Sequence, residues 1–336
     1  PGSGKSFFAK REMANAFFAT NDHILILDPE NEYTALTEQL HGQTIYLAPD
    51  SHSYLNPMDL DLSTDVGESP MLMQADFLLS QCELMMASYG NPLMPIEKSL
   101  IDRCISLVYR DYLKNPRPEN MPILGDLYQC LREQHNSRAD DLATAMEIYV
   151  TGSLSYLNHR TNVDLNNRMV CYNISKLGQG LKKLVMSNVQ KHIWQRTAVN
   201  RYAGITTRIF LDEFHLLLKE PQTAAYTAEI YKRFRKWNGI PTSLTQNVKD
   251  LLDSSEIENI LENSDFVLML NQGASDRNIL AQRLGISPQE LSHVTNSSEG
   301  EGLLFFGDKI IPFEDKFPRD TQLYRVMTTK PSDLAA

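Results

Sequence analysis

The chain opens with "PGSGKSFFAKREMANAFFATNDHILILDPENEY", residues 1–33. Its first six residues match the second half of a phosphate-binding loop, G-x-x-x-x-G-K-[ST], whose first glycine would fall before Pro1. In such a loop glycines let backbone amides curl around phosphate oxygens, the lysine offsets phosphate charge and the serine hydroxyl binds Mg²⁺. A chance Gly-Lys-Ser before a helix is the alternative. The predicted nucleotide-binding residues are Gly2, Ser3, Gly4, Lys5, Ser6 and Phe7, with Ser6 also a metal ligand.

The rest of this stretch predicts a helix followed by a buried strand. From Ser6 onward apolar residues recur with helical spacing and are expected to share one face: Phe7, Phe8, Met13, Phe17 and Phe18. A helix that begins at the loop lysine suits phosphate binding, because its N-terminal amides and dipole face the anion. The apolar run Ile24–Leu27 is typical of a parallel strand that is covered on both faces.

An acidic turn follows this strand. "DPENEY" places Asp28, Glu30 and Glu32 just beyond the strand's carboxyl end, where ligands bind in parallel sheets. Glu30 or Glu32 is therefore a candidate to position an attacking water or the loop, and Glu30 is counted among the catalytic residues. A turn rich in Asp and Asn for purely local reasons is the alternative.

Two parts of the chain alternate strand and helix patterns, and a purely helical stretch separates them. Amphipathic helices broken by Pro, Gly and Asn predict an all-α insertion over residues 67–164. Strands return with "RMVCYNIS" and continue to a hairpin turn at Gly307–Asp308. The alternation predicts an α/β fold with a mostly parallel sheet. The expected organisation is a core in two parts, 1–66 and 165–328, interrupted by the insertion and followed by a tail, 329–336.

A second chemical motif lies in "RIFLDEFH", residues 208–215. An apolar strand there delivers Asp212 to the edge of the sheet, where its carboxylate can hold Mg²⁺ through water, and Glu213 stands where a general base could polarise the attacking water. The alternative is that Asp-Glu caps the next helix. Together with Lys5 and Ser6, the pair predicts nucleotide hydrolysis. His215 is expected to be an ordinary residue on a helix face.

Two further residues are candidates for catalysis. Gln246, in "SLTQNV", follows an apolar strand and could sense the γ-phosphate and orient water, unless it only ends that strand. Arg235, in "YKRFRKWNG", lies on a helix with a basic face and could reach the γ-phosphate of a neighbouring subunit as an arginine finger. A solvated basic face is the alternative, and Arg277 and Arg283 are weaker candidates for the same role.

Composition narrows the class of protein. The 336 residues are 42% hydrophobic and 22% charged, as in an ordinary soluble protein with a sizeable core. A net charge of −10 argues against a surface coated for non-specific nucleic-acid binding, although it leaves room for a local basic track. No apolar run approaches the roughly 20 residues of a membrane helix. The four cysteines show no paired spacing and are expected to be free thiols.

The order of these motifs resembles a known family. The phosphate-binding loop, "DPENEY", "LNPMD", the helical insertion, "FLDEFH", "RFRKWNG", "SLTQN" and "GEGLLFFGDKIIPF" follow one another as in the C-terminal ATPase domain of conjugative-transfer (TraC/TraE-like) ATPases of type IV secretion systems. These belong to the HerA–FtsK group of RecA-like P-loop motors, and the resemblance covers nearly the whole chain. It departs from the family at "FH", where a tryptophan-containing motif is usual, so His215 inherits no role.

The resemblance implies a function and its partners. It implies a RecA-like ATPase that uses ATP and Mg²⁺, forms a homo-hexamer, and works at the cytoplasmic face of the cell membrane with channel and coupling proteins, and possibly DNA. The motor would energise channel assembly and the transfer of DNA or protein. By the resemblance Lys5 and Ser6 take the phosphate-loop positions, Asp212 and Glu213 the metal and base positions, Arg235 the finger and Gln246 the sensor.

Two alternative functions are a HerA/FtsK-like translocase of duplex DNA and a scaffold whose nucleotide site only regulates docking on channel proteins.

The incomplete loop at Pro1 suggests a fragment cut at a motif boundary. We accordingly expect this chain to bind nucleotide weakly and to be a weak or inactive ATPase.

Overall fold

The computed structural model describes residues 4–62, 69–87, 93–246, 256–271, 279, 281, 284–295 and 297–330. Gly2, Ser3, Arg277 and Arg283 lie outside these residues. The segment "SDRNILAQRLG", whose pattern predicts a helix, also lies mostly outside the described residues, as does most of the tail. Among the described residues, no helix combines the length and the apolar character that crossing a membrane requires.

The chain divides into two compact units, which are described separately here. The first comprises Pro1–Thr44, Arg168–Cys171 and Ala203–Ala336, and the second comprises Ile45–Asn167 and Tyr172–Tyr202. The division passes through the strands β2 (Gln43–Tyr46) and β3 (Met169–Asn173). It does not follow the borders of the insertion predicted at 67–164, and that four-part organisation stays a prediction.

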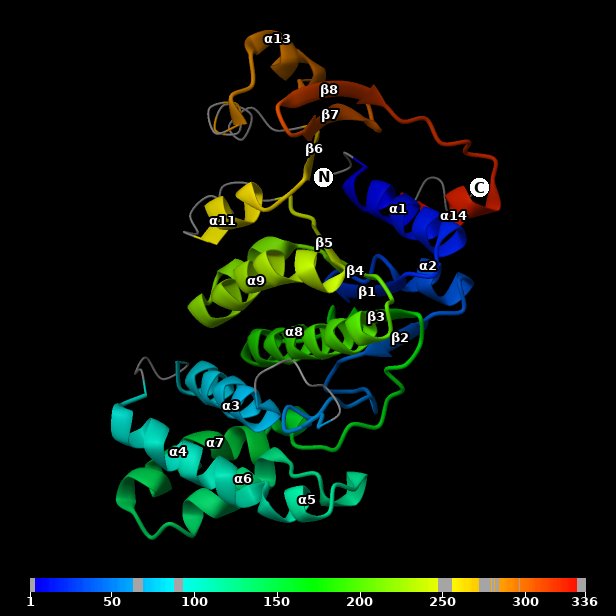
Figure 1. Cartoon of the computed structure of the whole chain (residues 1–336). Coiled ribbons are helices and arrows are strands. Elements are labelled where there is room, and N and C mark those ends of the chain that lie inside the picture. The colour runs from blue at the N-terminus through cyan, green and yellow to red at the C-terminus, as the bar shows by residue number, and fades with distance from the viewer. Residues whose placement is uncertain are drawn as a thin grey trace. The chain divides into compact units, whose positions relative to one another are not determined.

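The first unit contains most of the strands (Figure 1). Its described elements, in chain order, are α1 (Lys5–Ala19), β1 (His23–Asp28), α2 (Thr34–Gln39), β4 (Thr207–Leu211), the 3₁₀ helix η3 (Phe214–Leu218), α9 (Pro221–Phe234), η4 (Arg235–Trp237), β5 (Gly239–Ser243), α11 (Glu256–Glu262), β6 (Phe266–Leu270), α13 (Pro288–Leu291), η5 (Ser292–Val294), β7 (Glu301–Phe306), β8 (Lys309–Glu314) and α14 (Gln322–Met327).

A five-stranded sheet with the order β2-β3-β1-β4-β5 brings the predicted motifs together. β1 pairs with β4, and β4 with β5, in parallel. Leu27 lies opposite Leu211, which lies opposite Ser243, so the residues that follow these strands share one edge. The predicted α/β fold with a mostly parallel sheet is confirmed, and this edge is where Asp28, Asp212 and Gln246 emerge.

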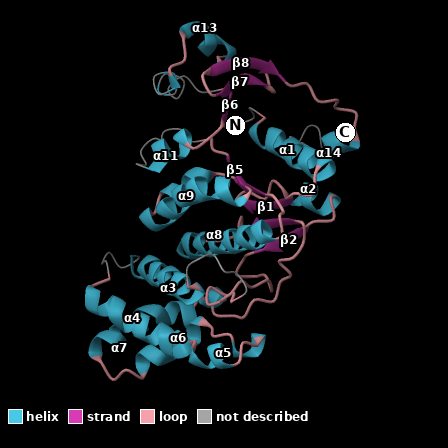
Figure 2. Ribbon diagram, viewed as in Figure 1, coloured by secondary structure: helices cyan, strands magenta, loops and turns pink. Residues whose placement is uncertain are grey.

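The strand at Phe266–Leu270 does not join that sheet. β6, β7 and β8 form a separate three-stranded antiparallel sheet, drawn with the other strands in magenta in Figure 2. Phe306 lies opposite Lys309, so Gly307 and Asp308 form the predicted hairpin turn, and Gly307 has a positive φ of 55°. Its small core of Met269, Leu303, Ile286 and Val294 explains why "FVLML" is apolar without being part of the parallel sheet.

Helix α1 packs on the parallel sheet mainly through small residues. Its buried positions are Ala9, Lys10, Met13, Ala14 and Ala16, in one core with Ile24, Ile26 and Phe210. The apolar residues predicted to share one face differ in burial, because Met13 is fully buried whereas Phe18 is 70% exposed. Alanines allow the helix backbone to approach the strands closely, which leaves the larger rings at the flanks. The guanidinium of Arg168, for example, lies over the ring of Phe17, with its Cζ 4.2 Å from the ring centroid.

In the part of the second unit that the structure describes, all regular elements apart from the ends of β2 and β3 are helical. They are α3 (Pro70–Ala87), α4 (Pro95–Val108), α5 (Arg110–Lys114), the 3₁₀ helix η1 (Pro118–Asn120), α6 (Leu124–Arg132), α7 (Ser137–Val150), the 3₁₀ helix η2 (Ser155–Leu157) and α8 (Gln179–Tyr202). Helices α3, α4, α6 and α7 pack against one another in this unit (Figure 1).

In the second unit a buried lysine ties α8 to the segment that contains "LNPMD". Lys191 is 6% exposed, and its Nζ donates to the carbonyl oxygens of Pro57 (2.9 Å) and Asp59 (2.6 Å). The ammonium also lies 4.6 Å from the centroid of the Phe77 ring. Burial lowers the pKa of Lys191 to about 7, although the Asp59 carboxylate opposes the shift. Burial of Lys191 therefore favours the neutral amine over the ammonium in the folded chain.

Lys191 predicts a pH dependence of stability. Between pH 7 and the ordinary lysine pKa the unfolded chain binds the proton that the folded chain lacks, so the free energy of unfolding rises with pH in this window. For one group the gain between pH 7 and 9 is about 2 kcal/mol. Urea unfolding followed by circular dichroism at the two pH values should show this gain in the wild-type chain and lose it in Lys191→Met. Lys114→Met, at an exposed position of α5, is the control and should keep it.

Candidate active site

The site begins at the first turn of α1. Gly4 is its N-cap residue, with φ 90° and ψ 9°, and the Gly4 carbonyl accepts a hydrogen bond from the Phe8 amide (2.9 Å). This left-handed conformation strains residues that carry a Cβ, so glycine suits the position. Ser6 is half-buried on the first turn, and the Phe7 ring packs 5.7 Å from Phe317 and 5.4 Å from Tyr324, measured between ring centroids. The Phe7 side chain is therefore part of the packing.

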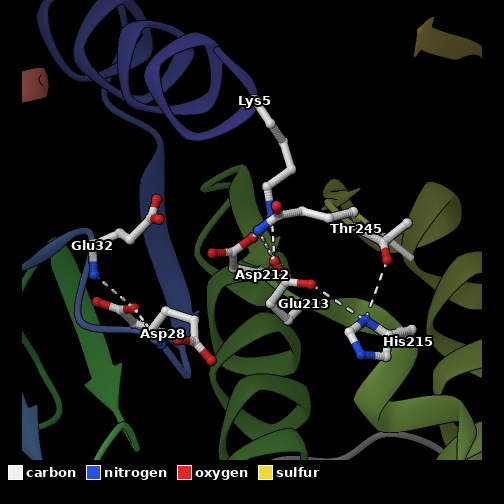
Figure 3. Close-up of polar contacts among 9 residues, drawn as sticks. Lys5, Asp28, Glu32, Asp212, Glu213, His215 and Thr245 are labelled. Carbon is white, nitrogen blue, oxygen red and sulfur yellow. Dashed lines mark hydrogen bonds and ion pairs between the residues drawn. The ribbon is translucent and has the colours of Figure 1, made fainter. Parts of the chain in front are cut away.

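Lys5 joins the two halves of the predicted site. Its Nζ donates to Asp212 Oδ1 at 2.6 Å and to Glu213 Oε1 at 2.8 Å, across 207 and 208 positions of sequence (Figure 3). The side chains of Lys5, Asp212 and Glu213 are 15%, 1% and 8% exposed. The structure thus brings the predicted loop lysine and the predicted acidic pair to one point at the edge of the parallel sheet.

The acidic pair is held by the ends of the neighbouring strands. The Asp212 amide donates to the Leu27 carbonyl at the end of β1 (3.2 Å), and the Phe214 amide donates to the Leu244 carbonyl after β5 (2.9 Å). Between them Glu213 adopts φ 43° and ψ 45°, the left-handed region that is uncommon for a residue with a side chain. Strain of this kind persists where the surroundings fix the backbone, and it is frequent at functional sites.

The charges at this edge shift one another's pKa values. Burial disfavours the Lys5 ammonium, but Asp212 and Glu213 outweigh it and raise the pKa of Lys5. Burial raises the pKa of Asp212 in spite of Lys5. Burial would also raise the pKa of Glu213, yet hydrogen bonds from Lys5 and Gln246 lower it below its ordinary value. Glu213 is therefore held as a carboxylate.

Glu213 is contacted by Gln246, which follows β5, and by His215, which follows the acidic pair. Gln246 Nε2 donates to Glu213 Oε1 at 2.7 Å, so the structure brings the predicted sensor to the predicted base. His215 Nδ1 lies 3.3 Å from Glu213 Oε2 and 3.2 Å from Thr245 Oγ1. His215 was expected from the sequence to be an ordinary residue on a helix face. Its position shortly after the acidic pair, within reach of the Glu213 carboxylate, is the signal that could have indicated a role at the site.

Glu30 and Arg235 do not enter this cluster. Glu30 is exposed, and its amide donates to Asp28 Oδ1 at 3.3 Å. The buried Asp28 carboxylate also accepts the amides of Glu32 (3.0 Å) and Tyr33 (2.9 Å), which organises the acidic turn (Figure 3). Arg235 is exposed on η4. A role for it at a neighbouring subunit's site, and for Glu30 toward water, stays a prediction.

Helix α1 carries a second lysine, which is buried. Lys10, on α1, is 1% exposed, donates to the Met327 carbonyl (3.1 Å) and lies 5.6 Å from the centroid of the Tyr33 ring. Burial lowers the pKa of Lys10, and Glu32, Asp28 and Asp212 oppose the shift. Among the described residues no group of three or more His, Cys, Asp and Glu side chains is arranged to hold a metal ion.

The chain is similar in fold to solved structures of VirB4 and of the plasmid coupling protein TrwB. The structure of VirB4 of Thermoanaerobacter pseudethanolicus is 23% identical, with a TM-score of 0.83, over 99% of this chain and 89% of that one. The plasmid coupling protein TrwB in complex with ADP and Mg²⁺ is 14% identical, with a TM-score of 0.62, over 96% of this chain and 86% of that one. TrwB with a non-hydrolysable ATP analogue gives a TM-score of 0.59 at the same identity, over 96% and 85%. No curated protein sequence matched the chain.

The structural matches support the fold, and a sequence-family match supports the identification. The model of the TraG P-loop domain matches residues 1–300. The resemblance inferred from the order of motifs is thereby confirmed at the level of the family, together with the P-loop NTPase fold. The chain belongs to the TraG P-loop domain family.

Proposed function

We propose that the chain is an ATP-hydrolysing motor domain of a type IV secretion or conjugation apparatus, acting with ATP and Mg²⁺. The observation that carries the proposal is the meeting of Lys5 Nζ with the carboxylates of Asp212 and Glu213 at the N-terminus of α1. The family match and the nucleotide-bound structures of TrwB support it. The motor would form a homo-oligomer, with a hexameric ring expected, and work with channel and coupling proteins at the inner face of the cell membrane.

The residues at the edge of the sheet fit ATP and Mg²⁺. A 15-residue helix, α1, directs its positive end and free amides toward an anion, and Gly4 and Lys5 stand at that end. The Ser6 hydroxyl and the buried Asp212 carboxylate are the hard oxygen donors that Mg²⁺ prefers. Bound there, the ion would neutralise phosphate charge. Phe7 belongs to the proposed loop through its backbone, and Gly2 and Ser3 are assigned to it from the sequence motif alone.

Each polar side chain has a proposed role in hydrolysis. Lys5 turns from the carboxylates to the phosphates and offsets their charge. Glu213 orients the attacking water and accepts its proton, and Gln246, already bonded to Glu213, places that carboxylate relative to the phosphate. Arg235 supplies positive charge to the site of a neighbouring subunit, and Glu30 positions water at the rim.

We also propose that the 336-residue chain by itself is a weak ATPase. Two features support this: phosphate has to displace both ion pairs of Lys5, and Arg235 would act only between subunits. Calorimetric titration with ATP and Mg²⁺ should give weak binding, with a dissociation constant of about 1 mM, which corresponds to a binding free energy of about −4 kcal/mol. Micromolar affinity would contradict this part of the proposal without touching the assignment of the residues.

Replacing Lys5 or Glu213 tests the hydrolytic site in the natural full-length protein. Glu213→Gln should lower kcat by about 100-fold or more, because the amide cannot accept the proton. Lys5→Ala should weaken nucleotide binding as well as hydrolysis. Phosphate release measures the rate, and Lys114→Ala, at an exposed position, should match wild type. Wild-type rates of hydrolysis in Glu213→Gln would contradict the proposed site.

A mating assay with Lys5→Ala distinguishes a motor from a scaffold. Transfer should stop if the chain is a motor and should persist if it is a scaffold.

Arg235 is tested by mixing inactive subunits. Arg235→Ala should lower ATP hydrolysis by about 10³-fold, as for other arginine fingers, whereas Lys236→Ala, at the adjacent exposed position, should not. If Arg235 acts on the neighbouring site, a mixture of Arg235→Ala and Glu213→Gln subunits should regain part of the activity, because an intact base then meets an intact finger. No recovery in mixed rings, shown to form by cross-linking, would exclude that role.

A further inference from the structure

The imidazole of His215 links the predicted base to the segment that follows β5. Its Nδ1 lies 3.3 Å from Glu213 Oε2 and 3.2 Å from Thr245 Oγ1, and the side chain of His215 is 13% exposed (Figure 3). Lys5 and Gln246 both donate to the other oxygen of the carboxylate, Oε1. The two oxygens of Glu213 therefore have separate partners.

The chemistry of this contact fixes where the proton of the imidazole has to be. An ionised carboxylate can only accept, so a stable contact at Oε2 requires the proton on Nδ1 of His215. The same N–H faces the Thr245 hydroxyl, which can accept from it and turn its own proton elsewhere. A His215 ring without a proton on Nδ1 would set two acceptors against each other at 3.3 Å.

We propose that His215 is a positioning residue for Glu213, and this rests on the proposed role of Glu213 as the base. When Lys5 turns to phosphate, Oε1 loses one of its donors, while the contact of His215 with Oε2 does not depend on Lys5. His215 thereby keeps the carboxylate aimed at the water during that exchange. Because Glu213 has left-handed backbone angles, its side chain starts from an unusual direction and needs such support.

The link also joins the base to β5. Thr245 and Gln246 are consecutive, and both reach Glu213, Thr245 through His215 and Gln246 directly. A displacement of this segment would therefore act on the Glu213 carboxylate through the hydrogen bond of Gln246 and through the contact of His215. His215 gives the chain a second connection between the end of β5 and the reacting centre, besides the glutamine.

Steady-state ATP hydrolysis by the natural full-length protein tests the proposal. His215→Ala should lower kcat by about 10-fold or more, since a small misplacement of a catalytic group costs that much, with the KM for ATP within about twofold of wild type. His215→Asn, whose amide N–H can occupy the position of Nδ1–H, should recover most of kcat. His52→Ala, an exposed histidine of the second unit, is the control and should match wild type.

The Thr245 side of the link provides a test that leaves His215 in place. Thr245→Val should lower kcat less than His215→Ala does, and Thr245→Ser should restore it, so the proposal stays testable even if His215→Ala fails to fold. Wild-type kcat in His215→Ala, or equal losses in His215→Ala and His215→Asn, would overturn the proposal. If Lys5→Ala and Glu213→Gln remain active, the proposed function itself fails; if they are inactive while His215→Ala is not, only the role of His215 fails.

Discussion

The contact on which the structure of the site depends is one ammonium against two carboxylates. Asp212 and Glu213 are neighbours in sequence and almost fully buried, so without Lys5 their charges would repel each other in a medium that screens poorly. Removing one partner from a buried ion pair typically costs about 3–5 kcal/mol. The contact requires α1 to begin at Lys5, which in turn requires the left-handed conformation of Gly4, and it requires β4 to end at Leu211.

The sheet edge concentrates negative charge and compensates it in two different ways. Backbone amides of the turn satisfy Asp28, a local solution that no ligand needs to disturb. Asp212 and Glu213 instead rely on a long, flexible lysine side chain from another element. The first arrangement holds a turn in one shape, whereas the second can exchange partners. This difference explains why Asp28 serves the architecture and the later pair is suited to chemistry.

Much of the site could be predicted because its residues stand at the ends of recognisable elements. Lys5 begins a helix and Asp212 ends an apolar strand, and parallel strands bring such ends to one edge. The place of His215 could not be predicted in this way, because it depends on the left-handed turn at Glu213 and on a 3₁₀ helix, which redirect the side chains that follow. The exposure of Phe18 and the separate sheet of β6 could not be predicted for a related reason. Apolar periodicity indicates that a residue can be buried, and the partner that buries it is decided by the rest of the fold.

The distribution of partners separates the tasks of the two acidic residues. If Lys5 moves to phosphate, Glu213 still receives hydrogen bonds from Gln246 and is contacted by His215, whereas the more deeply buried Asp212 loses its neutralising side chain. A buried carboxylate in that position needs another cation, and Mg²⁺ shared with the Ser6 hydroxyl would provide one. Glu213 needs no such replacement, so it can stay unprotonated and free of metal, which is the condition for accepting a proton from water. When Lys5, which contacts both carboxylates in this structure, moves to phosphate, Asp212 would then be left to the metal and Glu213 to the water.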